Sequence, residues 1–344
     1  MRFVVYGAGA VGGVIAARMH LGGVDVQLVA RGPHLDAIRS NGLRLVTPSE
    51  ETVVRIPAAG GLADLDVDPD TAVLVAVKSH HTAAVMRDVS ASTDADVTLV
   101  SAQNGVANEP TMLRGRSHVL GICVMLPSSH LEPGLVVQAS SKMPGLLDVG
   151  RYPRGTNERC EQVAAELRAG GFDSVVQPDI MAWKYRKLIM NLGNAAQAAF
   201  PQDADRDRLT ELAREEGERV LAAAGIQTIT REGDAARRRD LLDTSSMAAR
   251  GGGSTWQSLK RGTGDVETDY LNGEISMLGQ LHDIPTPAND LLRQIPGGWP
   301  PGASSLAPWP PPTCWRNCRS PGGTPTEPPH RMASRKSAPG RSAH

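Results

Sequence analysis

Residues 2–12 of the chain read RFVVYGAGAVG, and this stretch decides the fold. The apolar run RFVVY predicts a buried strand, and the GxGxxG pattern that follows it opens a predicted helix over residues 10–19. In such a turn the first glycine permits a tight bend, the second lets backbone approach a pyrophosphate, and the third lets the helix pack closely on the sheet. The helix N-terminus offers its free N–H groups to the phosphates. We therefore predict a dinucleotide-binding turn made of Gly7, Gly9, Ala10, Val11 and Gly12.

The end of the second predicted strand, over residues 24–30, indicates which dinucleotide binds. An acidic residue there grips the ribose 2′-hydroxyl of NAD, whereas an arginine meets the 2′-phosphate of NADP. Here the strand is followed by Arg31, and Asp25 lies at the strand's opposite end. We therefore expect NADP as the cofactor; the alternative for Arg31 is an ordinary surface arginine in a βα loop.

The alternation of β-branched runs with helical patterns predicts a parallel sheet with crossover helices in the first part of the chain. Further strands are expected over residues 71–77, 98–102 and 118–126, and an antiparallel extension over 135–138 and 145–148. From about Asp179 the strand signals stop, and helical periodicity covers residues 183–200, 207–224 and 266–281. The predicted fold class is α/β, with a Rossmann-type NADP-binding domain over 1–178 followed by an all-helical substrate and catalytic domain over 179–295.

The last part of the chain has a different composition. Residues 296–344 hold 12 of the 25 prolines and 6 of the 36 glycines, without any periodicity. Such a segment cannot bury enough apolar surface to offset its ordering entropy, so we expect a disordered tail. An out-of-frame reading of a high-GC gene would produce a tail of this kind, which we state as a hypothesis.

Composition and charge exclude several classes of protein. Lys+Arg 36 against Asp+Glu 37 gives a formal charge of −1, so there is no electrostatic case for nucleic acid. No run approaches the roughly 18–20 apolar residues of a membrane span. Four cysteines do not make a disulfide framework, which favours a reducing compartment, and we expect the cytoplasm. Arg2 and the small residues after it resemble a weak signal peptide, but the glycine pattern favours the cofactor turn.

Polar residues follow two of the predicted strands. Ligands of open α/β sheets bind at the carboxyl ends of the strands. Lys78 follows the strand over 71–77, and Asn104 follows the strand over 98–102. We expect both residues to line the nicotinamide and substrate side of the cofactor, although either one alone is also typical of a plain loop.

The predicted helix over 183–200 carries polar residues at a spacing that suits a binding site. Lys187, Asn191 and Asn194 are spaced i, i+4 and i+7, which puts one amine and two amides on one helical face. Their neighbours are apolar rather than of mixed charge, which favours a site over an exposed helix edge. Glu267, farther along, lies among acidic residues and is also typical of a solvated helix start.

Taken in this order, the motifs resemble those of the ketopantoate reductases (2-dehydropantoate 2-reductases). The resemblance covers the chain from Met1 to about Leu292. Its motifs are the Gly-rich turn with Arg31, the strand ends at Lys78 and Asn104, the helix WKYRKLIMN at 183–191, and the segment ETDYLNG at 267–273.

The resemblance implies roles for individual residues. Lys187 would protonate the substrate carbonyl oxygen, Glu267 would bind the substrate hydroxyl, and Asn104 and Asn191 would bind substrate. The family's substrate-binding serine falls at Thr255, with Ser254 adjacent. The chain departs from the family where a second asparagine is expected: that position is Ala195, and Asn194 precedes it.

The reaction that the resemblance implies is NADPH-dependent reduction of a small 2-oxo acid, 2-dehydropantoate, to pantoate in pantothenate biosynthesis. Lys187 is the expected general acid rather than Lys184, which has no amide four residues later. No metal ion, nucleic acid or membrane partner is expected, and a homodimer is left open. Two alternatives are a related NAD(P)-dependent dehydrogenase acting on another 2-oxo or hydroxy acid, and an NADP-binding or regulatory protein that has lost catalysis.

Overall fold

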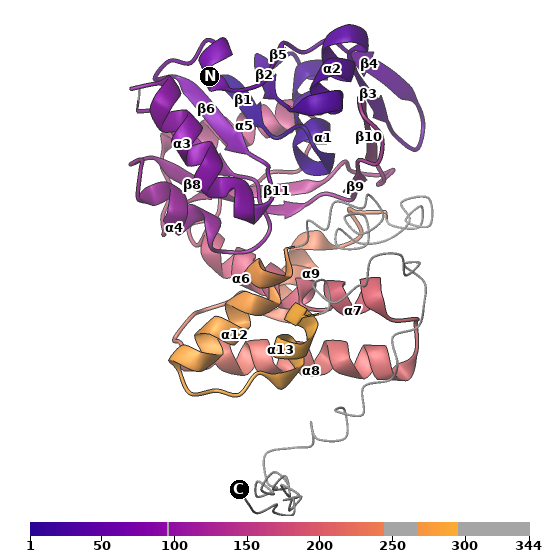
Figure 1. The fold of residues 1–344 in the computed structure, drawn as a ribbon, viewed down its shortest axis with the longest axis vertical. Coiled ribbons are helices and arrows are strands. Elements are labelled where there is room, and N and C mark those ends of the chain that lie inside the picture. The colour runs from indigo at the N-terminus through magenta and orange to yellow at the C-terminus, as the bar shows by residue number, and fades with distance from the viewer. Residues whose placement is uncertain (95, 244–266, 295–344) are drawn as a thin grey trace, which may run out of the picture. The chain divides into compact units, whose positions relative to one another are not determined.

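The structure, a computed structural model, describes residues 1–94, 96–243 and 267–294. Its N-terminal domain contains a seven-stranded sheet of order β11-β8-β7-β6-β1-β2-β5 (Figure 1). Neighbouring strands run parallel except β11, which is antiparallel to β8. The strands are β1 (Arg2–Tyr6), β2 (Val26–Val29), β5 (Ala58–Ala59), β6 (Thr71–Val75), β7 (Thr98–Ser101), β8 (Val119–Met125) and β11 (Leu146–Arg151). The predicted Rossmann-type sheet is confirmed.

Helices cover both faces of this sheet, so most residues of its strands are apolar and buried. Phe3 and Val5 of β1 point into the core under α1 (Ala10–Leu21) and α5 (Glu158–Ala169). Val4 points into the opposite core, under α3 (Thr82–Ser92) and α4 (Asn108–Leu113). The period of two along each strand therefore fills two cores from one apolar run.

A second sheet, of order β4-β3-β10-β9, was not expected as a separate unit. Its strands are β3 (Leu43–Val46), β4 (Glu51–Val54), β9 (Ser128–Ser129) and β10 (Leu135–Gln138), and α2 (Gly32–Asn41) precedes them. The prediction that residues 135–138 extend the main sheet is wrong, because β10 pairs with β3 and β9. A Cβ on Gly13 of α1 would lie 2.6 Å from Val136 Cγ1, so this glycine admits β10 against α1. The expected antiparallel extension by the segment at 145–148 is confirmed as β11.

The C-terminal domain is helical in the ranges that the structure describes (Figure 1). Its helices are α6 (Ile180–Asn191), α7 (Asn194–Ala199), α8 (Ala204–Ala223), α9 (Arg231–Arg238), α12 (Asn272–Leu281) and α13 (Pro287–Gln294). The single helix predicted over 183–200 is wrong: α6 ends before Gly193, where a Cβ would lie 2.5 Å from Thr210 Cγ2 of α8. The helix predicted over 266–281 begins instead as a 3₁₀ turn, η3 (Thr268–Tyr270), before α12.

The predicted tail over 296–344 lies outside the described ranges. In the part of the chain that the structure describes, no helix has the length and hydropathy of a membrane span.

Candidate active site

The Gly-rich turn has the geometry that a dinucleotide requires. Gly7 has φ +108°, a conformation that favours glycine, and a Cβ on Gly12 would lie 2.0 Å from the Gly7 carbonyl oxygen. Gly9 is different, since a Cβ there would meet nothing within 4 Å. Gly9 is also the N-cap residue of α1, and it has no side chain that could accept from the N–H groups of Val11 and Gly12. The turn thus combines tight packing at its ends with open space in its middle.

His34 anchors this turn and was not predicted. Its Nδ1 accepts from the Gly134 backbone N–H at 2.8 Å, so its Nε2 carries the proton and donates to the Ala8 carbonyl at 2.7 Å. Burial lowers the pKa of His34, which favours this neutral form. Nothing in the local sequence indicates the role, because Gly134 lies 100 residues away.

Arg31 follows β2 and caps the start of α2, as its predicted position requires. Its Nη2 donates to the Tyr6 hydroxyl at 3.2 Å, and that hydroxyl donates to Asp88 Oδ2 at 2.8 Å. Asp25 lies at the other end of β2 and accepts from Arg2 Nε at 3.0 Å. The carboxyl edge of β2 therefore presents an arginine rather than an acid.

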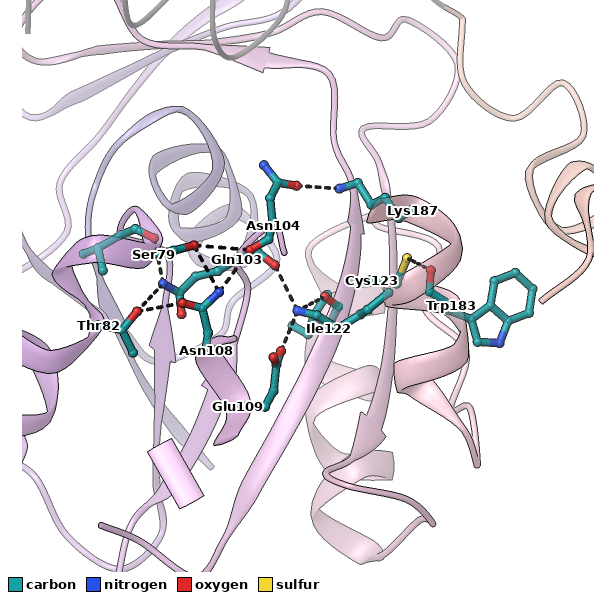
Figure 2. Close-up of polar contacts among 12 residues, drawn as sticks. Ser79, Thr82, Gln103, Asn104, Asn108, Glu109, Ile122, Cys123, Trp183 and Lys187 are labelled. Atoms are coloured by element: carbon teal, nitrogen blue, oxygen red, sulfur yellow. Dashed lines mark hydrogen bonds and ion pairs between the residues drawn. The ribbon is translucent and has the colours of Figure 1, made fainter. Parts of the chain in front are cut away.

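The ends of β6 and β7 are joined by buried hydrogen bonds. Lys78 precedes η2 (Ser79–His81), and Gln103 and Asn104 follow β7. Asn108 donates through Nδ2 to Ser79 Oγ at 3.2 Å and to the Asn104 carbonyl at 3.0 Å (Figure 2). This network joins the segments that follow β6 and β7, so Lys78 and Asn104 lie at the same edge of the sheet.

Lys187 reaches this edge from α6. Its Nζ donates to Asn104 Oδ1 at 2.8 Å and also to the Val124 carbonyl, and Figure 2 shows the two side chains pointing toward each other. Asn191 lies one turn later on α6, on the same face as predicted. Asn194 is not on that helix, because it begins α7 after the break. Both amides are partly exposed, and their side chains make no hydrogen bond within the described ranges.

Glu267, which directly precedes η3, reaches the same edge. Its Oε1 accepts from the Ser79 backbone N–H and from the Ser79 hydroxyl, each at 3.0 Å. Gly105 has φ +75°, and a Cβ there would lie 2.9 Å from the Tyr270 carbonyl, so a glycine lets η3 approach the loop after β7. Ser254 and Thr255 lie outside the described ranges. Ser79 was missed by the sequence reasoning, although it directly follows Lys78.

Comparison with known families gives two matches that together cover most of the chain. Residues 3–154 match the family described as ketopantoate reductase PanE/ApbA, and residues 179–296 match its C-terminal domain. A 2-dehydropantoate 2-reductase from Pyrococcus horikoshii is 27% identical over 300 residues, which cover 85% of this chain and 95% of that protein.

Solved structures share the fold. A PanE/ApbA family ketopantoate reductase from Ralstonia eutropha JMP134 superposes with a TM-score of 0.73 at 27% identity, covering 86% of this chain and 97% of that one. A D-mandelate dehydrogenase solved with NADH and anilino(oxo)acetate has a TM-score of 0.75 at 20% identity, covering 86% of this chain and 97% of that one. At 20% identity, the similarity to the D-mandelate dehydrogenase shows a shared fold and nothing more.

Proposed function

Because the chain belongs to the ketopantoate reductase family, we propose that it catalyses the NADPH-dependent reduction of 2-dehydropantoate to pantoate, in pantothenate and coenzyme A biosynthesis. The observation that carries the proposal is the Lys187 ammonium held 2.8 Å from Asn104 Oδ1, at the sheet edge where the Gly-rich turn also lies. This arrangement puts a proton donor next to the place where open α/β sheets bind their ligands.

The cofactor would bind through the turn and the strand ends. NADPH, when bound, supplies the hydride that adds to the carbonyl carbon of the substrate. The open space at Gly9 and the uncapped start of α1 support a pyrophosphate site formed by Gly7, Gly9, Ala10, Val11 and Gly12. Arg31 supports NADP over NAD through its charge, and Lys78 and Asn104 would line the nicotinamide side.

The protein's own groups would orient the substrate and move one proton. Lys187 donates a proton to the carbonyl oxygen as it becomes an alkoxide, and Asn104 keeps the ammonium aimed at that oxygen. Ser79 holds Glu267 through Oε1, and we assign the other oxygen, Oε2, to the substrate hydroxyl. The amides of Asn191 and Asn194, together with Ser254 and Thr255, would complete the substrate contacts.

The same proposal includes a domain boundary, a cellular compartment and an oligomeric state. The boundary between the two domains falls at 178/179 and the helical domain ends at 295, which the family match over 179–296 supports. The enzyme works in the cytoplasm, where the buried thiols of Cys123 and Cys160 stay reduced. A homodimer is the assembly to test first.

The experiment is a steady-state assay of the full chain that follows cofactor absorbance. NADPH and NADH are each paired with 2-dehydropantoate, pyruvate and the 2-oxo acid that corresponds to mandelate. The highest kcat/KM is expected for NADPH with 2-dehydropantoate. A higher value for another acid would assign the chain to a related dehydrogenase, and NADPH binding without turnover of any acid would make it a binding protein.

A further inference from the structure

A buried ion pair lies directly beneath the proposed site. Lys184 Nζ is 2.5 Å from Glu109 Oε1, and the two side chains are 2% and 0% exposed. Lys184 belongs to α6, and Glu109 belongs to α4 in the N-terminal domain. Among the described residues, Lys184 is the one ion-pair partner of Glu109, and neither carboxylate oxygen of Glu109 accepts a hydrogen bond.

Lys184 and Lys187 grip the same two segments from successive turns of α6. Lys184 Nζ donates to the Gln103 carbonyl at 2.9 Å and to the Ile122 carbonyl of β8 at 3.4 Å. Lys187 Nζ donates to Asn104, the next residue of that loop, and to the Val124 carbonyl, two residues farther along β8. In Figure 2 Glu109, Gln103 and Ile122 converge on one point beside the contact between Asn104 and Lys187. The buried pair therefore adds a contact, at the Gln103 carbonyl, to the hydrogen bonds that hold the loop carrying Asn104.

Strand β8, which lies against the pair, has a glycine where the two side chains approach it. A Cβ on Gly121, in the middle of β8, would lie 3.3 Å from Glu109 Oε1 and 3.5 Å from Lys184 Cδ. Glycine inside a strand weakens the strand, and it marks places where another group must approach closely. Burying two charges also costs free energy that an apolar pair of the same size would not cost. Stability alone therefore gives no reason for the pair.

We propose that Lys184 and Glu109 are positioning residues, which set the Gln103–Asn104 loop so that Asn104 holds the Lys187 ammonium in line with the substrate carbonyl. This inference rests on the proposed function for its activity readout. Glu109 neutralises Lys184 and fixes its ammonium, Lys184 fixes the Gln103 carbonyl, and Asn104 follows directly. Within the described ranges no hydrogen bond or ion pair joins this pair to the Gly-rich turn or to Arg31, so the Kd for NADPH should change far less than kcat.

The test is the double variant Lys184→Met/Glu109→Met, which replaces the pair by apolar side chains of similar length. Its thermal unfolding midpoint is expected to equal or exceed that of the wild type. Its kcat should fall by about 10–100-fold, the effect of displacing a catalytic group by an ångström or less, while the Kd for NADPH stays within about twofold. The matched control is Arg186→Met on the same helix, which removes an ion pair with Glu218 of α8 inside the helical domain. Its kcat should stay near the wild-type value.

A crystal structure of the double variant gives a readout that does not depend on the substrate. The distance from Lys187 Nζ to Asn104 Oδ1, 2.8 Å in the wild type, should exceed the hydrogen-bonding range. An unchanged distance together with a kcat within twofold of wild type would overturn the proposal and leave the pair a structural one. If wild type and control both fail to reduce 2-dehydropantoate, the proposed function is wrong, and the distance alone then decides whether the pair positions Lys187.

Discussion

Lys187 and Lys184 lie one turn apart on α6, and their surroundings assign them different tasks. Lys184 is 3% exposed and paired with a carboxylate, whereas Lys187 is partly exposed and faces an amide oxygen. We predict that Lys187→Ala lowers kcat by about 10²–10⁴-fold, the usual contribution of a general acid, with NADPH affinity unchanged. Small primary amines in the assay should restore part of the activity of this variant and none of the activity of Lys184→Met. A Lys187→Ala enzyme with near-normal kcat would show that the acid lies elsewhere.

Arg31 is exposed and is oriented by the Tyr6 hydroxyl. Replacing Arg31 by Ala should weaken NADPH binding by about 1.5–3 kcal/mol, the worth of hydrogen bonds to a charged group, and leave NADH binding unchanged. The measurement is the Kd of each cofactor from tryptophan fluorescence, with Arg39→Ala on the same helix as control. Equal affinity of the wild type for NADH and NADPH would contradict the choice of cofactor.

His34 should make stability depend on pH. Burial lowers its pKa below the ordinary 6.5, so the unfolded chain binds a proton more readily than the folded protein does. The contribution of His34 to the free energy of unfolding is therefore complete above pH 6.5. It is lost as the pH falls from 6.5 toward the lowered pKa of His34 in the folded protein. His34→Gln, which can also donate and accept, should lose less stability than wild type between pH 7 and 5 in urea unfolding. Parallel losses in the two proteins would exclude His34 as the source.

At the scale of elements, two glycines of one turn should respond in opposite ways to the same change. Gly12→Ala puts a Cβ against the Gly7 carbonyl and should lower the free energy of unfolding by about 1–3 kcal/mol. In Gly9→Ala the new Cβ lies in open space and φ is −70°, so the free energy of unfolding should change by less than about 0.5 kcal/mol. Its NADPH affinity should nevertheless fall at least tenfold, because the methyl group occupies the approach of the pyrophosphate. If Gly9→Ala bound NADPH with wild-type affinity, the cofactor would not bind at this turn.

The elements also show what the sequence could and could not predict. The strand, turn and helix over residues 2–21 were predictable because apolar pattern, glycine spacing and helix start all agree locally. The pairing of β10 with β3 and β9 was not predictable from the sequence. It depends on the close approach of β10 to α1, which the absence of a side chain at Gly13 allows. The break before α7 depends in the same way on Thr210 of another helix.

The same distinction applies to the site. Lys187 and Asn104 lie in local motifs that single out each of them as a candidate, whereas their contact at 2.8 Å depends on how the two domains pack. The partnership of Ser79 with Glu267 joins residues 188 positions apart, and no local pattern encodes it. Glu109 reads as an ordinary helix residue until the fold buries it against Lys184.

At the scale of the whole molecule, Arg237 of α9 ties the helical domain to the sheet. Its guanidinium lies 2.6 Å from Asp148 Oδ1 on β11 and 3.0 Å from Asp173 Oδ2, and the Asp148 side chain is 5% exposed. Arg237→Met leaves that buried carboxylate without its cation and should lower the free energy of unfolding by about 3–5 kcal/mol. Urea unfolding measures this loss in the free energy of unfolding, and the variant Arg239→Met at a neighbouring surface position is the control. A loss below about 1 kcal/mol would mean that other contacts hold the domains together.

Both residues assigned to the chemistry, Lys187 and Glu267, make their hydrogen bonds with residues of the other domain, Asn104 and Ser79. A gene that exchanged one domain with a relative by recombination would inherit one member of each pair and not the other. Substitutions at these four positions should therefore accumulate as matched sets. For an engineer, grafting this helical domain onto a different nucleotide-binding domain requires carrying the loops at residues 79 and 104 along with it.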